Sequence, residues 1–320
     1  MKQKELLAAI SKHIPKDKSI IDVISYVLDI SYPSAHRRIN GNAKISIDEA
    51  VKLAQHFDLS LDLIFNTGDD NIISVKKTQI TSDLKDLENY FQANVDTLAK
   101  LIKIKEASIV YCAKDLPISI SQQIDILSKF KLFVWLKLLN PSSNKKNLKN
   151  FLIPTSVKKN YRVIAKYNSQ VENIEIWDTT TINSTLKQIL YYYSVNQITH
   201  EESLLICEEL KNTILRLRER ASPNSKFKLY YNELLLMGNK MIIKTPLKST
   251  LYLQYTSMNY FKTNDPNTCE HTSQYINRLL ESCKLINTSS DKEKDIFFNK
   301  MLDKVESLHD HINAQKVLDF

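Results

Sequence analysis

Hydrophobic positions recur at helical spacing through the first 66 residues. Apolar side chains fall three or four positions apart, which is typical of amphipathic helices with one buried face. Ser46 and Glu49 form a capping box ahead of one such stripe, a strong sign of a helix start. The pattern predicts five short helices, over residues 2–14, 19–28, 31–40, 46–57 and 60–65.

The pattern changes after this segment. Residues 67–72 are polar and turn-rich, which predicts a linker between a domain over 1–66 and a larger one over 73–320. Helical spacing returns over residues 82–104, 121–139, 155–169, 181–195, 199–221, 265–283 and 290–312. Strand-like runs occur at residues 72–75, 107–112, 227–231, 241–244, 250–255 and 284–286.

Three of these runs, 227–231, 241–244 and 250–255, predict a small antiparallel meander. The expected fold class is therefore mainly α with a smaller β part (α+β). It combines a five-helix N-terminal domain with a mostly helical C-terminal domain that carries a small antiparallel sheet. Residues 200–320 also have the order of elements found in sensor domains of the GAF or PAS kind, an analogy at the level of fold alone.

Composition narrows the function classes. No apolar run approaches the ~20 residues that cross a bilayer, so we expect a cytoplasmic chain without a membrane partner. Only three glycines occur, which excludes glycine-rich phosphate loops and dinucleotide fingerprints. The four cysteines are far apart, and no nucleophile lies in a recognisable catalytic setting. We therefore expect no metal, no cofactor and no enzyme activity.

The net charge of +8 favours polyanionic partners, and its distribution sharpens this expectation. Within residues 1–44 eight lysines and arginines stand against four acids, whereas residues 45–65 are acidic. In the helix over 31–40, Ala35 and Ile39 face inward, which turns Arg37 outward. Ser31 is the expected N-cap residue of this helix, and Asn40-Gly41 should end it.

These residues carry a resemblance to a known family. The string DISYPSAHRRINGNAKISIDEAVKLAQHFDLSLDLIF, residues 29–65, resembles the helix-turn-helix of the phage-repressor and Cro family, the lambda-repressor-like regulators. A turn, a serine-capped recognition helix, an Asn-Gly stop, a Ser-x-x-Glu-Ala helix and a final Ser-Leu-Asp helix follow in the family's order. The chain departs from the family at Asp29, where a glycine is usual, and before the second helix, where Lys18-Ser19-Ile20-Ile21 replaces a Thr-Gln-Glu-Glu opening.

The resemblance implies a bacterial or phage-like transcription regulator that binds double-stranded DNA as a homodimer, with the third helix in the major groove. It assigns Ser34 and Arg37 to base edges. The implied DNA-binding residues are Lys18, Ser31, Tyr32, Ser34, Arg37, Arg38, Asn40 and Lys44. The C-terminal domain would then serve dimerisation, or sensing of a small-molecule or protein effector.

A second hypothesis comes from a different class of protein. The N-terminal helices could contact a protein instead of DNA, as in an interaction or signalling adaptor.

The very apolar helix over 121–139 fits a core helix, a dimer seam or the wall of a ligand pocket.

Overall fold

The chain consists of two compact units, residues 1–74 and 75–320. The computed structural model describes residues 2–15, 18–65, 73–78, 82–117, 120–140, 147–234 and 238–318. The predicted linker over 67–72 lies outside the described residues. Each unit has its own hydrophobic core and is treated separately below.

The first unit is built from short helices. They are α1 Lys2–Ser11, α2 Ile20–Leu28, α3 Tyr32–Ile39, α4 Ile47–His56 and α5 Leu61–Phe65. The capping box at the start of α4 is confirmed, because Ser46 Oγ accepts the Glu49 N–H and the Glu49 carboxylate accepts the Ser46 N–H. The core of this unit is made of Leu6, Leu7, Ile10, Ile24, Leu28, Ala35, Ala50 and Leu53.

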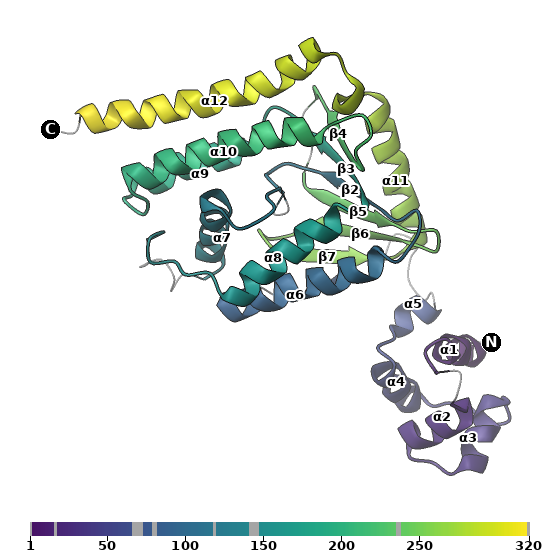
Figure 1. The fold of residues 1–320 in the computed structure, drawn as a ribbon. Coiled ribbons are helices and arrows are strands. Elements are labelled where there is room, and N and C mark those ends of the chain that lie inside the picture. The colour runs from purple at the N-terminus through teal and green to yellow at the C-terminus, as the bar shows by residue number, and fades with distance from the viewer. Residues whose placement is uncertain are drawn as a thin grey trace. The chain divides into compact units, whose positions relative to one another are not determined.

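An eight-stranded sheet forms the centre of the second unit (Figure 1). Its strands are β1 Lys76–Lys77, β2 Ser108–Cys112, β3 Glu172–Trp177, β4 Phe227–Tyr231, β5 Lys240–Lys244, β6 Ser249–Gln254, β7 Tyr260–Thr263 and β8 Lys284–Leu285. The spatial order is β1-β7-β6-β5-β2-β3-β4-β8. The three strands β2, β3 and β4 are mutually parallel, and the other neighbours pair antiparallel.

The expected fold class was wrong at this point. The sheet is large and mixed, not a small antiparallel one, and it runs through the whole second unit. The meander predicted from 227–231, 241–244 and 250–255 does not form as such: β5 and β6 pair with each other, but β4 pairs with β3 and β8. The strands after residue 200 therefore share one sheet with β2 and β3 and are not a separate sensor-like sheet.

Helices cover both faces of this sheet. They are α6 Leu84–Leu101, α7 Ile126–Leu139, α8 Thr155–Asn168, α9 Asn183–Ser194, α10 His200–Arg220, α11 Pro266–Glu281 and α12 Asp291–Leu318, with a 3-10 turn at Ile286–Thr288. Helix α11 packs on one face, where Cys269 and Ile276 meet Val110 and Ile176. The other six pack their buried apolar side chains on the opposite face. This arrangement follows from strand geometry, since successive side chains of a strand point to opposite faces.

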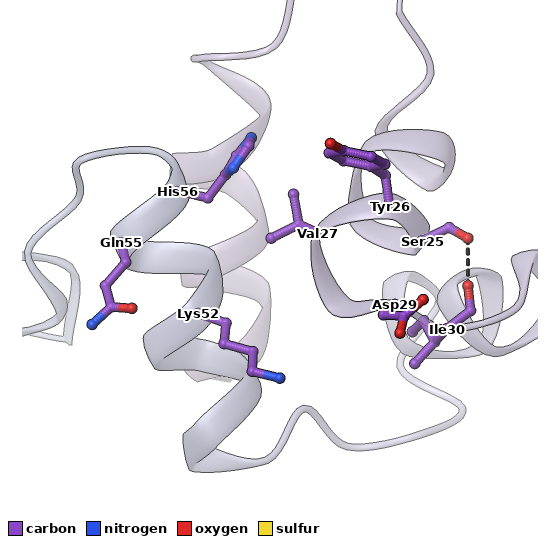
Figure 2. Close-up of a pocket in the computed structure, with 8 residues that line it drawn as sticks. All are labelled: Ser25, Tyr26, Val27, Asp29, Ile30, Lys52, Gln55 and His56. Atoms are coloured by element: carbon purple, nitrogen blue, oxygen red, sulfur yellow. Dashed lines mark hydrogen bonds between the residues drawn. The ribbon is translucent and has the colours of Figure 1, made fainter.

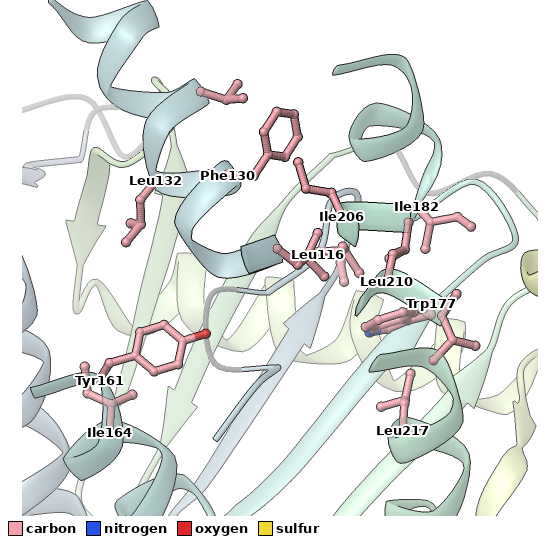
Figure 3. Close-up of a cluster of buried hydrophobic side chains, with 14 of the residues drawn as sticks. Leu116, Phe130, Leu132, Tyr161, Ile164, Trp177, Ile182, Ile206, Leu210 and Leu217 are labelled. Carbon is pink, nitrogen blue, oxygen red and sulfur yellow. The ribbon is translucent and has the colours of Figure 1, made fainter. Parts of the chain in front are cut away.

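The core on the six-helix face is large and closely packed (Figure 3). Trp177 of β3 lies beneath α10, next to Leu210 and Leu217. The apolar helix predicted over 121–139 is α7, and Phe130 and Phe133 are buried in this core. The core interpretation of that segment is confirmed.

Strand β3 lies inside the sheet between β2 and β4, and the sequence pattern did not predict it. Its residues Asn173 and Glu175 are buried, although both types are depleted in strands. Each has its own polar partners: Asn173 Nδ2 donates to the carbonyl of Asn168 at 2.6 Å, and Glu175 accepts the Trp177 Nε1–H at 2.8 Å.

Within the described residues, no helix is long and apolar enough to span a bilayer.

Candidate nucleic-acid interface

Helix α3 is short and has well-defined ends. Ser31 is the N-cap residue, as predicted, and has an extended backbone. Its hydroxyl donates to Ser34 Oγ at 3.0 Å and forms no cap hydrogen bond. The predicted stop is confirmed: the helix ends at Ile39, and Gly41 follows with a φ of 78°, a left-handed value that suits glycine. Ala35 is fully buried, which fixes the face that α3 turns to the core.

The turn between α2 and α3 is closed by hydrogen bonds from both sides. Asp29 adopts a left-handed conformation with φ 55° and ψ 48°. The Ile30 N–H donates to the Ser25 carbonyl at 3.1 Å, and Ser25 Oγ donates back to the Ile30 carbonyl at 2.5 Å (Figure 2). A glycine is usual at this place in the family that the sequence resembles. Aspartate is among the few other residues that tolerate a left-handed backbone, so the turn keeps its shape.

Arg38 is bound to α4. Its Nη2 donates to Glu49 Oε1 at 2.6 Å, and its Nε donates to Glu49 Oε2 at 3.1 Å, a two-point contact between half-buried side chains. The hydrogen bond from Arg38 lowers the pKa of Glu49 below its ordinary value, although partial burial acts in the opposite direction. The ion pair therefore fixes the angle between α3 and α4.

Gln3 of α1 fixes the loop after α3. Its Nε2 donates to the carbonyls of Arg38 at 2.7 Å and Ala43 at 2.9 Å, and its Oε1 accepts the Ile45 N–H at 3.1 Å. The Arg37 carbonyl accepts two further N–H groups from this loop, those of Asn42 and Ala43. The backbone around Arg37 is thus held by α1 and by the loop after α3.

The remaining predicted residues lie on the solvent side of the unit. Tyr32 is half exposed, Arg37 is exposed, and Asn40 Nδ2 lies 3.0 Å from His36 Nε2 one turn earlier. Ser34 is half-buried. Exposed side chains among the predicted DNA-binding residues are those of Lys18, Ser31, Tyr32, Arg37, Asn40 and Lys44.

The structure thus separates the two arginines of α3. Arg38, one of the implied DNA-binding residues, donates its guanidinium N–H groups to Glu49 and to the Ser34 carbonyl. No hydrogen bond or ion pair to another described residue holds the Arg37 side chain. Sequence reasoning missed both Gln3 and Glu49 as residues that position α3. Glu49 was visible as part of the capping box, but nothing in its spacing indicated a partner eleven residues earlier.

An open groove lies between α2 and α4 (Figure 2). Tyr26, Val27 and Lys52 are among the residues that line it. Tyr26 is 82% exposed, and so is Ile47 at the start of α4. Exposed apolar side chains of this size can add contact area to an interface with another protein.

No protein-family model, no curated protein and no solved structure matches the chain.

Proposed function

We propose that residues 2–65 bind duplex DNA, with α3 in the major groove, and that the chain is a transcription regulator. The presentation of Arg37 carries this proposal. Its side chain is exposed and has no partner among the described residues, while its backbone is fixed by the loop after α3. An arginine held in this way is suited to a two-point contact with guanine, the commonest specific contact in protein–DNA complexes.

The Arg38–Glu49 pair supports the same proposal. A recognition helix must keep its orientation on the duplex, and α3 is fixed to α4 by this pair and to α1 through Gln3. Lys18 and Lys44 are exposed before α2 and after α3, where ammonium groups can contact the phosphate backbone. Arg38 then acts as a positioning residue and Arg37 as the base-contacting one.

Sequencing of genomic fragments that co-purify with the full chain tests the proposal. We expect one enriched sequence motif. In a binding assay on that motif and a scrambled duplex, Arg37→Ala should lower the discrimination between the two by about 1–3 kcal/mol, or roughly 5- to 150-fold. Lys44→Ala should weaken binding to both duplexes alike and reduce its dependence on salt.

Lys12→Ala is the matched control. Lys12 is an exposed lysine directly after α1 and belongs neither to α2 and α3 nor to the loop after α3. Its loss should leave the discrimination between duplexes unchanged. Equal discrimination by the wild type and Arg37→Ala would overturn the assignment of α3 as the recognition helix.

Tyr26 and Ile47 favour one alternative, an adaptor that uses the same helices for protein contact. The two functions separate in one measurement. The adaptor predicts weak DNA binding that lacks a motif, and it predicts that Tyr26→Ser abolishes capture of a protein partner while Arg37→Ala does not. An enriched motif that depends on Arg37 contradicts the adaptor.

A further inference from the structure

The carboxyl ends of the three parallel strands bring polar residues to one edge of the sheet. Lys114 follows β2, Asp178 follows β3 and Asn232 follows β4. The parallel pairing continues past the strands, because the Ala113 N–H donates to the Ile176 carbonyl and the Asn232 N–H to the Trp177 carbonyl. Lys114, Asp178 and Asn232 therefore lie side by side in register. In sheets with parallel strands this edge is where ligands bind.

Two of these side chains are joined through Thr180. Lys114 Nζ donates to Thr180 Oγ1 at 3.0 Å and lies 3.8 Å from Asp178 Oδ2. Asp178 Oδ1 accepts the Thr180 N–H at 2.6 Å and its hydroxyl at 2.5 Å. Lys114 is 39% exposed in its side chain, whereas Asp178 is buried. The Lys114 side chain is thus the more accessible member of this ion pair.

Asn232 supplies a donor with no acceptor. The residue is 1% exposed, and its Oδ1 accepts the Leu234 N–H at 2.8 Å. This bond identifies the other amide atom as Nδ2, which is buried and lacks a hydrogen-bond partner. An unpaired buried donor is unfavourable, so a ligand that accepts from it is favoured at this position.

The charges at this edge also favour the binding of an anion. Lys304 of α12 donates to the Thr179 carbonyl at 2.6 Å and to Asn183 Oδ1 at 3.1 Å, and none of the described carboxylates pairs with it. Asp115 is neutralised by Lys131 at 2.8 Å. Glu233, which follows Asn232, is paired with Lys284 at 3.5 Å, and Asp178 lies 3.8 Å from Lys114, so Lys304 adds positive charge at this edge. Helix α9 starts at Asn183 without a side-chain cap, and its dipole adds positive potential.

We propose that this edge binds a small oxyanion, the carboxylate or phosphate group of a metabolite. Lys114 and the Asn232 amide donate to it, and Lys304 contributes its charge and its third N–H. Thr180 keeps Lys114 in place. The site does not depend on DNA binding, because every residue in it belongs to the second unit.

Thermal unfolding of the full chain, followed by tryptophan fluorescence, tests the site. Both tryptophans, Trp135 and Trp177, belong to the second unit, so the signal reports that unit. Sodium phosphate or sodium acetate replaces sodium chloride at constant ionic strength. We expect a saturable rise in the midpoint temperature with one of the two anions. A response to phosphate assigns a phosphate group, and a response to acetate assigns a carboxylate.

Lys114→Met should raise the anion concentration for half of the effect by about tenfold or more, since a charge-assisted bond is lost. Asn232→Asp should also raise this anion concentration, because the new carboxylate repels the anion. If the Asn232→Asp variant does not fold, the Lys114→Met result is sufficient to test the proposal. Lys226→Gln is the matched control, because Lys226 precedes β4 at the opposite edge. Responses no larger than with chloride, or equal responses in Lys114→Met and the wild type, would overturn the proposal by indicating an adventitious ion only.

Discussion

Adjacent arginines in α3 have different surroundings, and this difference decides what each can do. Ala35 and Ile39 set the phase of the helix, from which the sequence predicts that Arg37 faces outward. The same phase places Arg38 at the margin of the exposed face of α3, where the tertiary structure determines its partner. Glu49 comes from α4, so the bidentate pair depends on an angle between helices that no local pattern encodes.

The Arg38–Glu49 pair should make the first unit sensitive to acid. The pKa of Glu49 is lowered in the folded chain, so the unfolded chain binds more protons, and the stabilisation present above pH ~4.5 is lost as the pH falls. Hydrogen exchange of the full chain, read as protection factors over α3 and α4, should fall between pH about 6 and about 3.5. Arg38→Gln should lower the protection at pH about 6 by roughly fivefold and remove most of the pH dependence. An unchanged acid response in Arg38→Gln would contradict this role of the pair.

Asp29 occupies a backbone conformation that few residues accept. Because its φ is 55°, Asp29→Gly should leave the stability of the first unit unchanged or raise it by up to about 1 kcal/mol. Asp29→Val should lower it by about 1–2 kcal/mol, since a β-branched side chain clashes in the left-handed region. Hydrogen exchange over α2 and α3 measures both. Asp22→Val, at an exposed helical position, is the control. Equal losses in the two valine variants would show that the turn conformation is not the cause.

At the scale of elements, the helices with clear caps were predictable and β3 was not. The capping boxes at Ser46 and Thr199 start α4 and α10 where the sequence places them, because a capping box is complete within four residues. Strand β3 alternates only over Ile174-Glu175-Ile176, and its Glu172, Asn173 and Glu175 are of types that are depleted in strands. Its buried Glu175 is tolerated because Trp177 donates to it and Arg220 interacts with its charge, and Arg220 is far along the chain.

Glu175 should therefore stabilise β3 through its acceptor atoms. Glu175→Leu leaves the Trp177 Nε1–H and the half-buried Arg220 without this carboxylate, and we expect a loss of about 1–3 kcal/mol in the free energy of unfolding of the second unit. Glu175→Gln keeps an acceptor for Trp177 and should lose less. Urea unfolding followed by tryptophan fluorescence measures both variants. A leucine variant more stable than the glutamine variant would contradict this assignment.

For the whole molecule, the organisation of the second unit depends on pairings between distant segments. The strand character of 107–112 and 227–231 was predicted correctly, but not which strands would be neighbours. Strand β5 follows β4 closely in the sequence, after residues 232–239, whereas β3 ends at Trp177, yet β4 pairs with β3 and not with β5. The candidate DNA-binding residues could be located from local sequence patterns alone. The polar edge formed by Lys114, Asp178 and Asn232 needed the strand order, and the sequence alone did not reveal it.

Two copies of the chain should act together on DNA if the proposed function is right. One α3 contacts few base pairs, so a symmetric dimer would bind two half-sites about 34–36 Å apart. We expect an inverted repeat in the enriched fragments and a complex of two chains per duplex by light scattering. Insertion of about 5 base pairs between the half-sites turns them to opposite faces of the duplex and should abolish tight binding. A single unrepeated site bound by one chain would contradict a dimer.

The pairing of β1 with β7 has a consequence for how the chain is made. Lys76 is the register partner of Lys262, and the Thr78 N–H donates to the Tyr260 carbonyl at 2.8 Å. These partners are far apart in the sequence of the second unit. The first unit is compact within the first 74 residues and can fold on the ribosome soon after they emerge. Strand β1 can pair with β7 only after Thr263, the last residue of β7, has been synthesised. We therefore expect a period during synthesis in which α3 is already formed while the polar edge of Lys114, Asp178 and Asn232 and the rest of the second unit are still incomplete.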